Sequence, residues 1–199
     1  MAINKIICVF LLSFCFSCKS HKIKSQTSIL ITYVNDVLVN KPYSLGEKYS
    51  KNGIRLNSNN NNNWIIEYLN ENEIKGIDFY PRISDSVLES LFNKKAIEHY
   101  HNQFLEDNLN LNNIDFSNSK IKIKVYSESI LDIKDNYKLP IINVSKPVFS
   151  LKNEYAILFT STSHETMLHL FKKNKKNWKY FSKYNLVFPD INNRDNQSK

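Results

Sequence analysis

The chain has 199 residues, a formal net charge of +8 and 42% hydrophobic residues, which together fit one folded domain better than two. Its three glycines stand too far apart for the glycine-rich loops that cradle nucleotide phosphates. All of its cysteines lie near the amino terminus, at Cys8, Cys15 and Cys18. The rest of the chain therefore cannot form a disulfide, a cysteine zinc site or a cysteine nucleophile.

The amino-terminal segment has the layout of a signal peptide. Lys5 provides a positive charge, an apolar run extends from Ile6 to Phe16, and the small residue Ser17 precedes Cys18. The run is too short for the ~20 apolar residues of a transmembrane helix. An ordinary secretory signal and an apolar N-terminal anchor remain alternatives at this point.

The residues Cys15-Phe16-Ser17-Cys18 resemble the end of a bacterial lipoprotein signal. The resemblance implies removal of residues 1–17 and attachment of acyl chains to Cys18, which would hold the protein at a membrane. Lys19 follows Cys18 where lipoproteins retained at the inner membrane often have Asp. The resemblance thus implies an outer-membrane lipoprotein of the cell envelope that faces the periplasm.

Polarity patterns divide the mature chain into a lipidated tether over residues 18–28, a folded domain over 29–191 and a disordered polar tail over 192–199. Residues 29–39 are rich in β-branched side chains around a central Asn35-Asp36, which favours a β-hairpin. A helix is the alternative, because several of the apolar residues also recur at helical spacing.

The middle of the chain predicts two strands and one long helix. Residues 58–63 form an asparagine-rich loop, and residues 64–69 and 74–80 have the composition of strands joined by a polar turn. Ser86 and Glu89 match a capping box, and apolar residues then recur at intervals of three or four to about Asn108.

The carboxyl-terminal half predicts a mainly antiparallel sheet. Lysines and aliphatic residues alternate strictly over residues 120–125, which places them on opposite faces of a strand. Further strands are predicted at residues 141–144, 155–160, 167–171 and 178–181. We therefore expect one α+β domain in which a mainly antiparallel sheet packs against one long helix.

Two local resemblances accompany these patterns. Ile31-Thr32-Tyr33-Val34-Asn35-Asp36-Val37, with Leu69-Asn70-Glu71-Asn72-Glu73-Ile74 further on, is similar to the start of the plug domain of TonB-dependent receptors. Val144-Ser145-Lys146-Pro147-Val148-Phe149-Ser150, with Tyr155-Ala156-Ile157-Leu158 and Trp178-Lys179, resembles small uncharacterised lipoproteins of the Bacteroidota, of flavobacterial type. The second group has no assigned reaction, so this resemblance implies no catalytic residues.

The sequence contains no assembled catalytic or metal motif. His164 and His169 flank a near match to H-E-x-x-H, but one extra residue separates them, so neither a regular helix nor a strand directs both at one ion. His99 and His101 are two residues apart on the predicted helix, so their side chains diverge and cannot bind one metal ion together. Ser161 and Ser163 lie close to His164 without a nucleophile-elbow motif. We expect no catalytic residues, no metal site and no cofactor.

Lysines concentrate at the last predicted hairpin, where a basic surface patch is formed by Lys172, Lys173, Lys175 and Lys176, extended by Lys179 and Lys183. Such a patch could meet anionic lipid head groups or serve as a solvated edge that discourages aggregation. The chain has no nucleic-acid-binding motif, so nucleic acid is not expected as a partner.

The leading hypothesis is a non-enzymatic, lipid-anchored binding module whose partner in the periplasm is a protein or a glycan. The alternatives are a small envelope hydrolase, whose site is assembled only in the fold, and an immunity-type inhibitor of a toxin.

Overall fold

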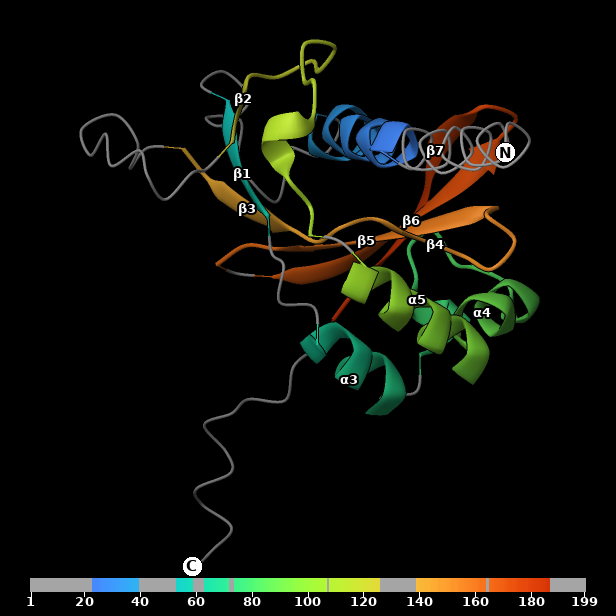
Figure 1. Cartoon of the computed structure of the whole chain (residues 1–199). Coiled ribbons are helices and arrows are strands. Elements are labelled where there is room, and N and C mark those ends of the chain that lie inside the picture. The colour runs from blue at the N-terminus through green and yellow to red at the C-terminus, as the bar shows by residue number, and fades with distance from the viewer. Residues whose placement is uncertain are drawn as a thin grey trace, which may run out of the picture.

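The computed structural model describes residues 23–39, 53–58, 63–71, 74–106, 108–125, 139–163 and 165–186. The expected signal peptide 1–17, the expected lipidation site Cys18 and the expected tail 192–199 lie outside these residues. The described residues form an α+β domain in which helices cover both faces of one mixed sheet (Figure 1).

The sheet contains seven described strands in the order β2-β1-β3-β5-β6-β7, with β4 paired to β5. Their bounds are β1 (Ile54–Ser58), β2 (Ile123–Val125), β3 (Ile141–Val144), β4 (Val148–Phe149), β5 (Tyr155–Ser161), β6 (Thr166–Asn174) and β7 (Asn177–Asn185). β1 runs parallel to both of its neighbours, and the other pairs are antiparallel. The four strands predicted from residue 141 onward are confirmed.

The sequence pattern did not predict β1 or the two-residue strand β4. Ile54, Arg55 and Leu56 are all buried, so this short strand lacks the alternation of a half-exposed one. Gly53 enters it with a φ of 91°, and a Cβ there would lie 2.5 Å from the backbone oxygen of Lys122. Glycine is therefore required where β1 first meets β2.

One helical segment covers one face of the sheet. Residues 23–32 are α-helical and continue into the π-helix η1 (Tyr33–Leu38). The hairpin predicted for residues 29–39 is therefore wrong and the helical alternative is correct, because the buried residues recur at helical spacing: Ile29, Leu30, Tyr33, Val34 and Val37. Residues 23–28 of the expected tether are also helical, and Gln26 is buried.

The other face of the sheet is covered by α3 (Asn63–Glu71), α4 (Asp85–Phe92) and α5 (Lys94–Glu106) (Figure 1). The strand predicted for residues 64–69 is wrong, because Ile65, Ile66 and Leu69 bury one face of helix α3. The strand predicted for residues 74–80 is also wrong. That segment forms the 3-10 helix η2 (Gly76–Asp78) and joins the sheet through one bridge from Tyr80 to Lys183.

The single long helix that we predicted is two helices. Ser84, not Ser86, caps α4, because its side chain accepts a hydrogen bond from the Val87 N–H at 3.4 Å. Asn93 then adopts an extended backbone and caps α5 by accepting a hydrogen bond from the Ala96 N–H at 2.9 Å. The apolar spacing continues through this segment, but the Asn93 side chain hydrogen-bonds to backbone groups and divides it into two helices. The predicted burial of its apolar face is confirmed at Leu91 and Tyr100.

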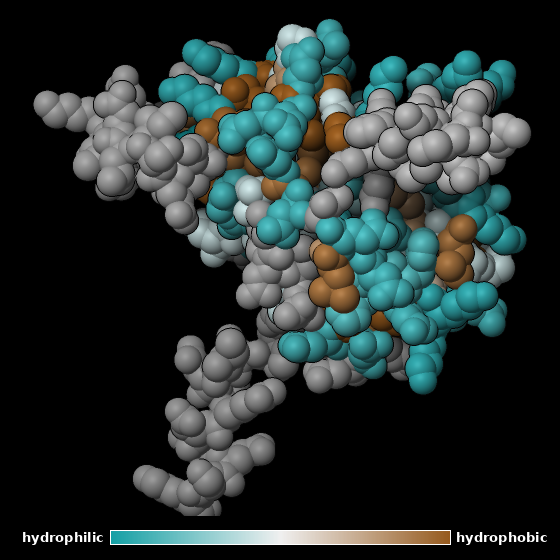
Figure 2. All heavy atoms as spheres, viewed as in Figure 1, coloured by the Kyte–Doolittle hydropathy of each residue, from teal (hydrophilic) through white to brown (hydrophobic). Residues whose placement is uncertain are grey.

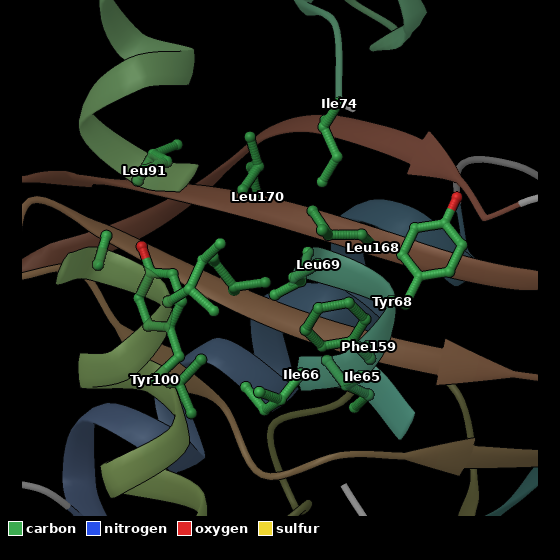
Figure 3. Close-up of a cluster of buried hydrophobic side chains, with 14 of the residues drawn as sticks. Ile65, Ile66, Tyr68, Leu69, Ile74, Leu91, Tyr100, Phe159, Leu168 and Leu170 are labelled. Carbon is green, nitrogen blue, oxygen red and sulfur yellow. The ribbon is translucent and has the colours of Figure 1, made fainter. Parts of the chain in front are cut away.

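The core on the α3–α5 side contains the side chains in Figure 3, among them Leu91, Tyr100, Phe159, Leu168 and Leu170. Alternate residues of β5 and β6 point to the opposite face, where Leu158 and Phe171 pack beneath the N-terminal helix. Both strands are therefore buried on both sides, as expected of central strands in a three-layer fold. The short 3-10 helix η3 (Leu111–Asn113), which precedes β2 in the chain, completes the second core.

A glutamine joins α5 to the sheet. The Gln103 amide donates a hydrogen bond to the Phe149 carbonyl oxygen at 2.7 Å and accepts one from the Phe149 N–H at 2.9 Å. Buried Lys146 donates a hydrogen bond to the Gln103 carbonyl oxygen. These bonds satisfy polar groups in an apolar setting and fix the position of α5 relative to β4.

Candidate functional site

A groove of about 680 Å³ lies where α3, η2 and α4 meet. Its lining combines aliphatic, aromatic and charged side chains: Leu69, Ile74, Lys75, Gly76, Ile77, Arg82, Asp85, Leu88, Glu89, Phe92 and Asn93. The volume lies in the range of small-molecule and peptide-side-chain sites. This groove is the candidate functional site among the described residues.

The wall of the groove is held by a close backbone contact. The Ile83 N–H donates a hydrogen bond to the Gly76 carbonyl oxygen at 3.2 Å. A Cβ at Gly76 would lie 2.6 Å from the Ile83 carbonyl oxygen, so a larger residue would force the two segments apart. Ser84 starts α4 directly afterwards, which places Asp85, Leu88 and Glu89 along the groove.

The floor of the groove is apolar and its rim is charged. Leu69 and Ile74 are buried, and Leu88 and Phe92 are half-buried, so they form a hydrophobic base. Both signs of charge are present on the exposed rim, from Lys75 and Arg82 and from Asp85 and Glu89. The two acids are four residues apart and share one face of α4. Such a surface can bind an apolar side chain and orient charged groups beside it.

These rim residues were not predicted from the sequence. Arg82 and Asp85 lie just before the predicted helix, and Lys75 lies in the segment predicted as a strand. The spacing of Asp85 and Glu89 was a usable signal for a shared helix face, but nothing local indicated that α3 and η2 would complete the groove.

The lysines of the predicted basic patch lie together at the turn between β6 and β7. Lys172, Lys175 and Lys176 are exposed and Lys173 is half-buried. The Lys172 Nζ lies 5.6 Å from the ring centroids of Tyr155 and Phe181, and the Lys173 Nζ lies 5.4 Å from that of Trp178. Lys172 and Lys173 therefore leave β6 on opposite faces.

The histidines do not form a metal centre in the described part of the chain. His169 is buried in β6, with its Nε2 3.0 Å from the Thr160 hydroxyl oxygen. His164 lies outside the described residues, so the pairing of Ser161 or Ser163 with it does as well. His99 packs near Tyr100, with ring centroids 6.3 Å apart. Among described residues no three His, Cys, Asp or Glu side chains gather at metal-binding range.

A buried polar cluster surrounds His169 beneath the π-helix. The rings of Tyr33 and Tyr180 lie 5.0 and 6.2 Å from the His169 ring. Burial raises the pKa of Tyr33 well above its ordinary value, against the lowering effect of a hydrogen bond with Thr160. Tyr33 therefore stays protonated, and the cluster connects the N-terminal helix to β5 and β6.

Comparisons with known proteins returned no match from family models, curated proteins or solved structures. Within the described ranges, no helix has both the length and the hydrophobicity required to span a bilayer.

Proposed function

We propose that this chain is a lipid-anchored protein of the cell envelope, facing the periplasm, that acts as a non-enzymatic binding module. The anchor is Cys18, which follows the signal-like segment 1–17. The binding site is the groove between α3, η2 and α4, and its occupant is a peptide segment of a partner protein. The observation that carries this proposal is the apolar floor enclosed by a rim of both charges.

The composition of the groove favours a peptide over a glycan. Its base consists mainly of the aliphatic residues Leu69, Ile74 and Leu88, which bind apolar side chains. Glycan sites depend on exposed aromatic faces, whereas Phe92 is half-buried. A rim with cations and anions suits a segment that carries charges next to an apolar anchor, since opposite charges then meet across the interface.

The same residues favour binding over hydrolysis. The charged side chains lie on the exposed rim, and no described hydrogen bond or ion pair joins the carboxylate of Asp85 or Glu89 to another titratable group. A hydrolytic site requires a nucleophile or water positioned against a base in a shielded pocket. No specific observation favours the immunity-type alternative.

The anchor is tested by replacing Cys18 with alanine. Cells that produce the wild-type chain and the Cys18→Ala variant are fed a clickable palmitate analogue. We expect label and a processed chain for the wild type, and an unlabelled precursor for the variant, because Cys18 alone follows a small residue. A Cys15→Ala variant is the matched control and should be labelled. Label that persists on Cys18→Ala would show that the anchor was misassigned.

The groove is tested by site-specific photo-crosslinking in the producing cells. A photoreactive phenylalanine analogue replaces Ile77, which lines the groove and is 61% exposed, or Leu105, which is 67% exposed on α5 outside the groove. We expect a discrete protein adduct from position 77 that disappears when Leu88 is changed to Lys. Absence of an adduct at position 77, or an identical adduct at position 105, would refute the groove as the binding site.

A further inference from the structure

Two turns lie side by side at one end of the sheet, and lysines lie in both of them and on the strands beside the second. The turn between β4 and β5 spans residues 150–154, and the turn between β6 and β7 spans 174–177. Tyr155 pairs with Lys172, and the Lys173 N–H donates a hydrogen bond to the Glu154 carbonyl oxygen at 2.8 Å. Both turns appear on the right-hand side of Figure 1.

We call this surface the basic end. It consists of Leu151 and six lysines: Lys152, Lys172, Lys173, Lys175, Lys176 and Lys179. Glu154 is the one carboxylate in the two turns, and no described ion pair joins these lysines to a carboxylate. Hydrophilic atoms border the upper right of the molecule in Figure 2, on the side where the β6–β7 turn lies. The basic end therefore presents a concentrated positive charge to solvent.

The arrangement of these lysines works against folding stability. Lys172 and Lys179 are direct cross-strand partners, and like charges in that position repel each other. Lys175 has a φ of 56°, a conformation that glycine or asparagine adopts at lower cost. Neither the cross-strand pairing of Lys172 with Lys179 nor the backbone conformation at Lys175 favours lysine, whereas an anionic ligand outside the chain would relieve the repulsion.

An apolar group lies among the charges. Leu151 is 44% exposed at the first turn, and Lys172 covers the rings of Tyr155 and Phe181. A lysine-rich surface that also exposes an aliphatic side chain suits the interface of a bilayer, where the aliphatic side chain enters the acyl boundary and the ammonium groups meet phosphates.

The geometry points to a membrane-docking surface: we propose that the basic end rests on anionic phospholipid of the bilayer that holds the acylated Cys18. This inference depends on the proposed anchor. Four residues separate Cys18 from Ile23, so the five Cα-to-Cα steps between them can span at most about 18 Å. In Figure 1 the described N-terminal helix runs from right to left, so it begins on the side of the molecule where the two turns lie. A short tether would thus present the basic end to the membrane and leave the groove available to its partner.

The test uses the purified, processed chain. Removal of residues 1–17 leaves Cys18 as its sole cysteine, so acylation at Cys18 allows one engineered thiol to be labelled uniquely. Leu151→Cys carries an environment-sensitive dye, and the chain is reconstituted into vesicles of phosphatidylcholine with or without phosphatidylglycerol. We expect a blue shift of dye emission with phosphatidylglycerol that is lost in phosphatidylcholine alone or in high salt.

Matched variants locate the effect. The double change Lys175→Glu and Lys176→Glu should abolish the shift. Lys94→Glu with Lys95→Glu, which changes the net charge equally at exposed positions on α5, should retain it. A dye at Leu105→Cys should not respond.

Mass spectrometry of the same preparation shows whether Cys18 carries acyl groups, so a missing anchor and a missing surface contact are separate results. If the chain is acylated and the dye emission does not change with phosphatidylglycerol, the proposed docking surface is wrong. A response to soluble dextran sulfate without a response to vesicles would also overturn it and assign the basic end to a polyanion. If Cys18 carries no acyl group, the proposed anchor fails. A Leu151→Cys chain that also carries Cys18→Ala then keeps one thiol for the dye, and the dependence of its emission on phosphatidylglycerol still decides the docking surface.

Discussion

Two buried tyrosines of this domain differ in whether their hydroxyl groups are satisfied. Tyr100 is fully buried in the core shown in Figure 3, and its hydroxyl meets no hydrogen-bond partner among the described residues. Tyr33 is buried on the other side of the sheet and shares a hydrogen bond with Thr160. Because an unsatisfied buried polar group is costly, the two phenols should contribute to stability with opposite sign.

We therefore predict that Tyr100→Phe leaves the free energy of unfolding unchanged or raises it by up to about 1 kcal/mol, since only a desolvated hydroxyl is removed. Tyr33→Phe should lower that free energy by about 1 kcal/mol, because it leaves Thr160 with one bond fewer. Urea unfolding followed by circular dichroism measures both. A loss larger than about 1 kcal/mol for Tyr100→Phe would mean that its hydroxyl has a partner in solution.

At the scale of elements, α4 and α5 show how one residue reorganises a helical pattern. Asn93 ends α4 through its N–H and side-chain amide, both of which donate to the Glu89 carbonyl oxygen, at 3.2 and 2.8 Å. The same residue begins α5 through its carbonyl and amide oxygens, which accept hydrogen bonds from Ile97 and Ala96. The break allows α4 to follow the groove while α5 lies along the sheet.

The contribution of α4 to the core can be measured at Leu91, which is 0% exposed. Leu91→Ala should lower the free energy of unfolding by about 2–5 kcal/mol, because it removes buried methyl groups and leaves a cavity. Leu105→Ala is the matched control on α5, where the side chain is 67% exposed, and should change stability by less than about 0.5 kcal/mol. Equal effects of the two substitutions in denaturant unfolding would contradict the described packing of α4.

For the molecule as a whole, the N-terminal helix determines how the domain would be joined to the anchor proposed at Cys18. The helix packs across the sheet through Ile29, Leu30 and Tyr33, so it belongs to the folded domain. In η1, at the carboxyl-terminal end of this helical segment, the Asn35 side-chain oxygen accepts a hydrogen bond from the Lys120 N–H at 2.7 Å. The chain between Cys18 and the domain is correspondingly short.

Alkaline pH should destabilise the whole domain. Burial raises the pKa of Tyr33 and Tyr100 above the value of about 10 in the unfolded chain. Below pH 10 both states hold these protons and stability is unaffected. Above pH 10 the unfolded state loses them first, so the free energy of unfolding should fall by up to ~1.4 kcal/mol per pH unit for each tyrosine.

Denaturant unfolding between pH 8 and 11.5 measures this slope, and absorbance at 295 nm reports tyrosine ionisation in the same samples. The Tyr33→Phe and Tyr100→Phe double variant should show a shallower fall in stability above pH 10. An unchanged slope in that variant would mean that these two tyrosines do not control alkaline unfolding.

The sequence alone determined the class of the fold and most of its antiparallel strands. The apolar runs at 141–144 and 155–160 predicted strands correctly, and the strict alternation of residues 120–125 predicted a strand of which Ile123–Val125 forms β2. Side-chain period and β-branched content act locally. Clustered lysines around residue 175 were likewise visible without a structure, since a hairpin keeps sequence neighbours together. The signal-like segment ending at Cys18 is a prediction of the same local kind.

Tertiary structure decided the elements whose local patterns were ambiguous. Residues 29–39 and 64–69 are helical because each places its apolar side chains against one face of the sheet, which outweighs their β-branched and aromatic composition. β1 forms because Ile54–Ser58 enters between two strands that follow much later in the chain. The groove could not be predicted from the sequence, because α3, η2 and α4 become neighbours only through the packing of the core. The free energy of burial acts there between residues that are distant in sequence.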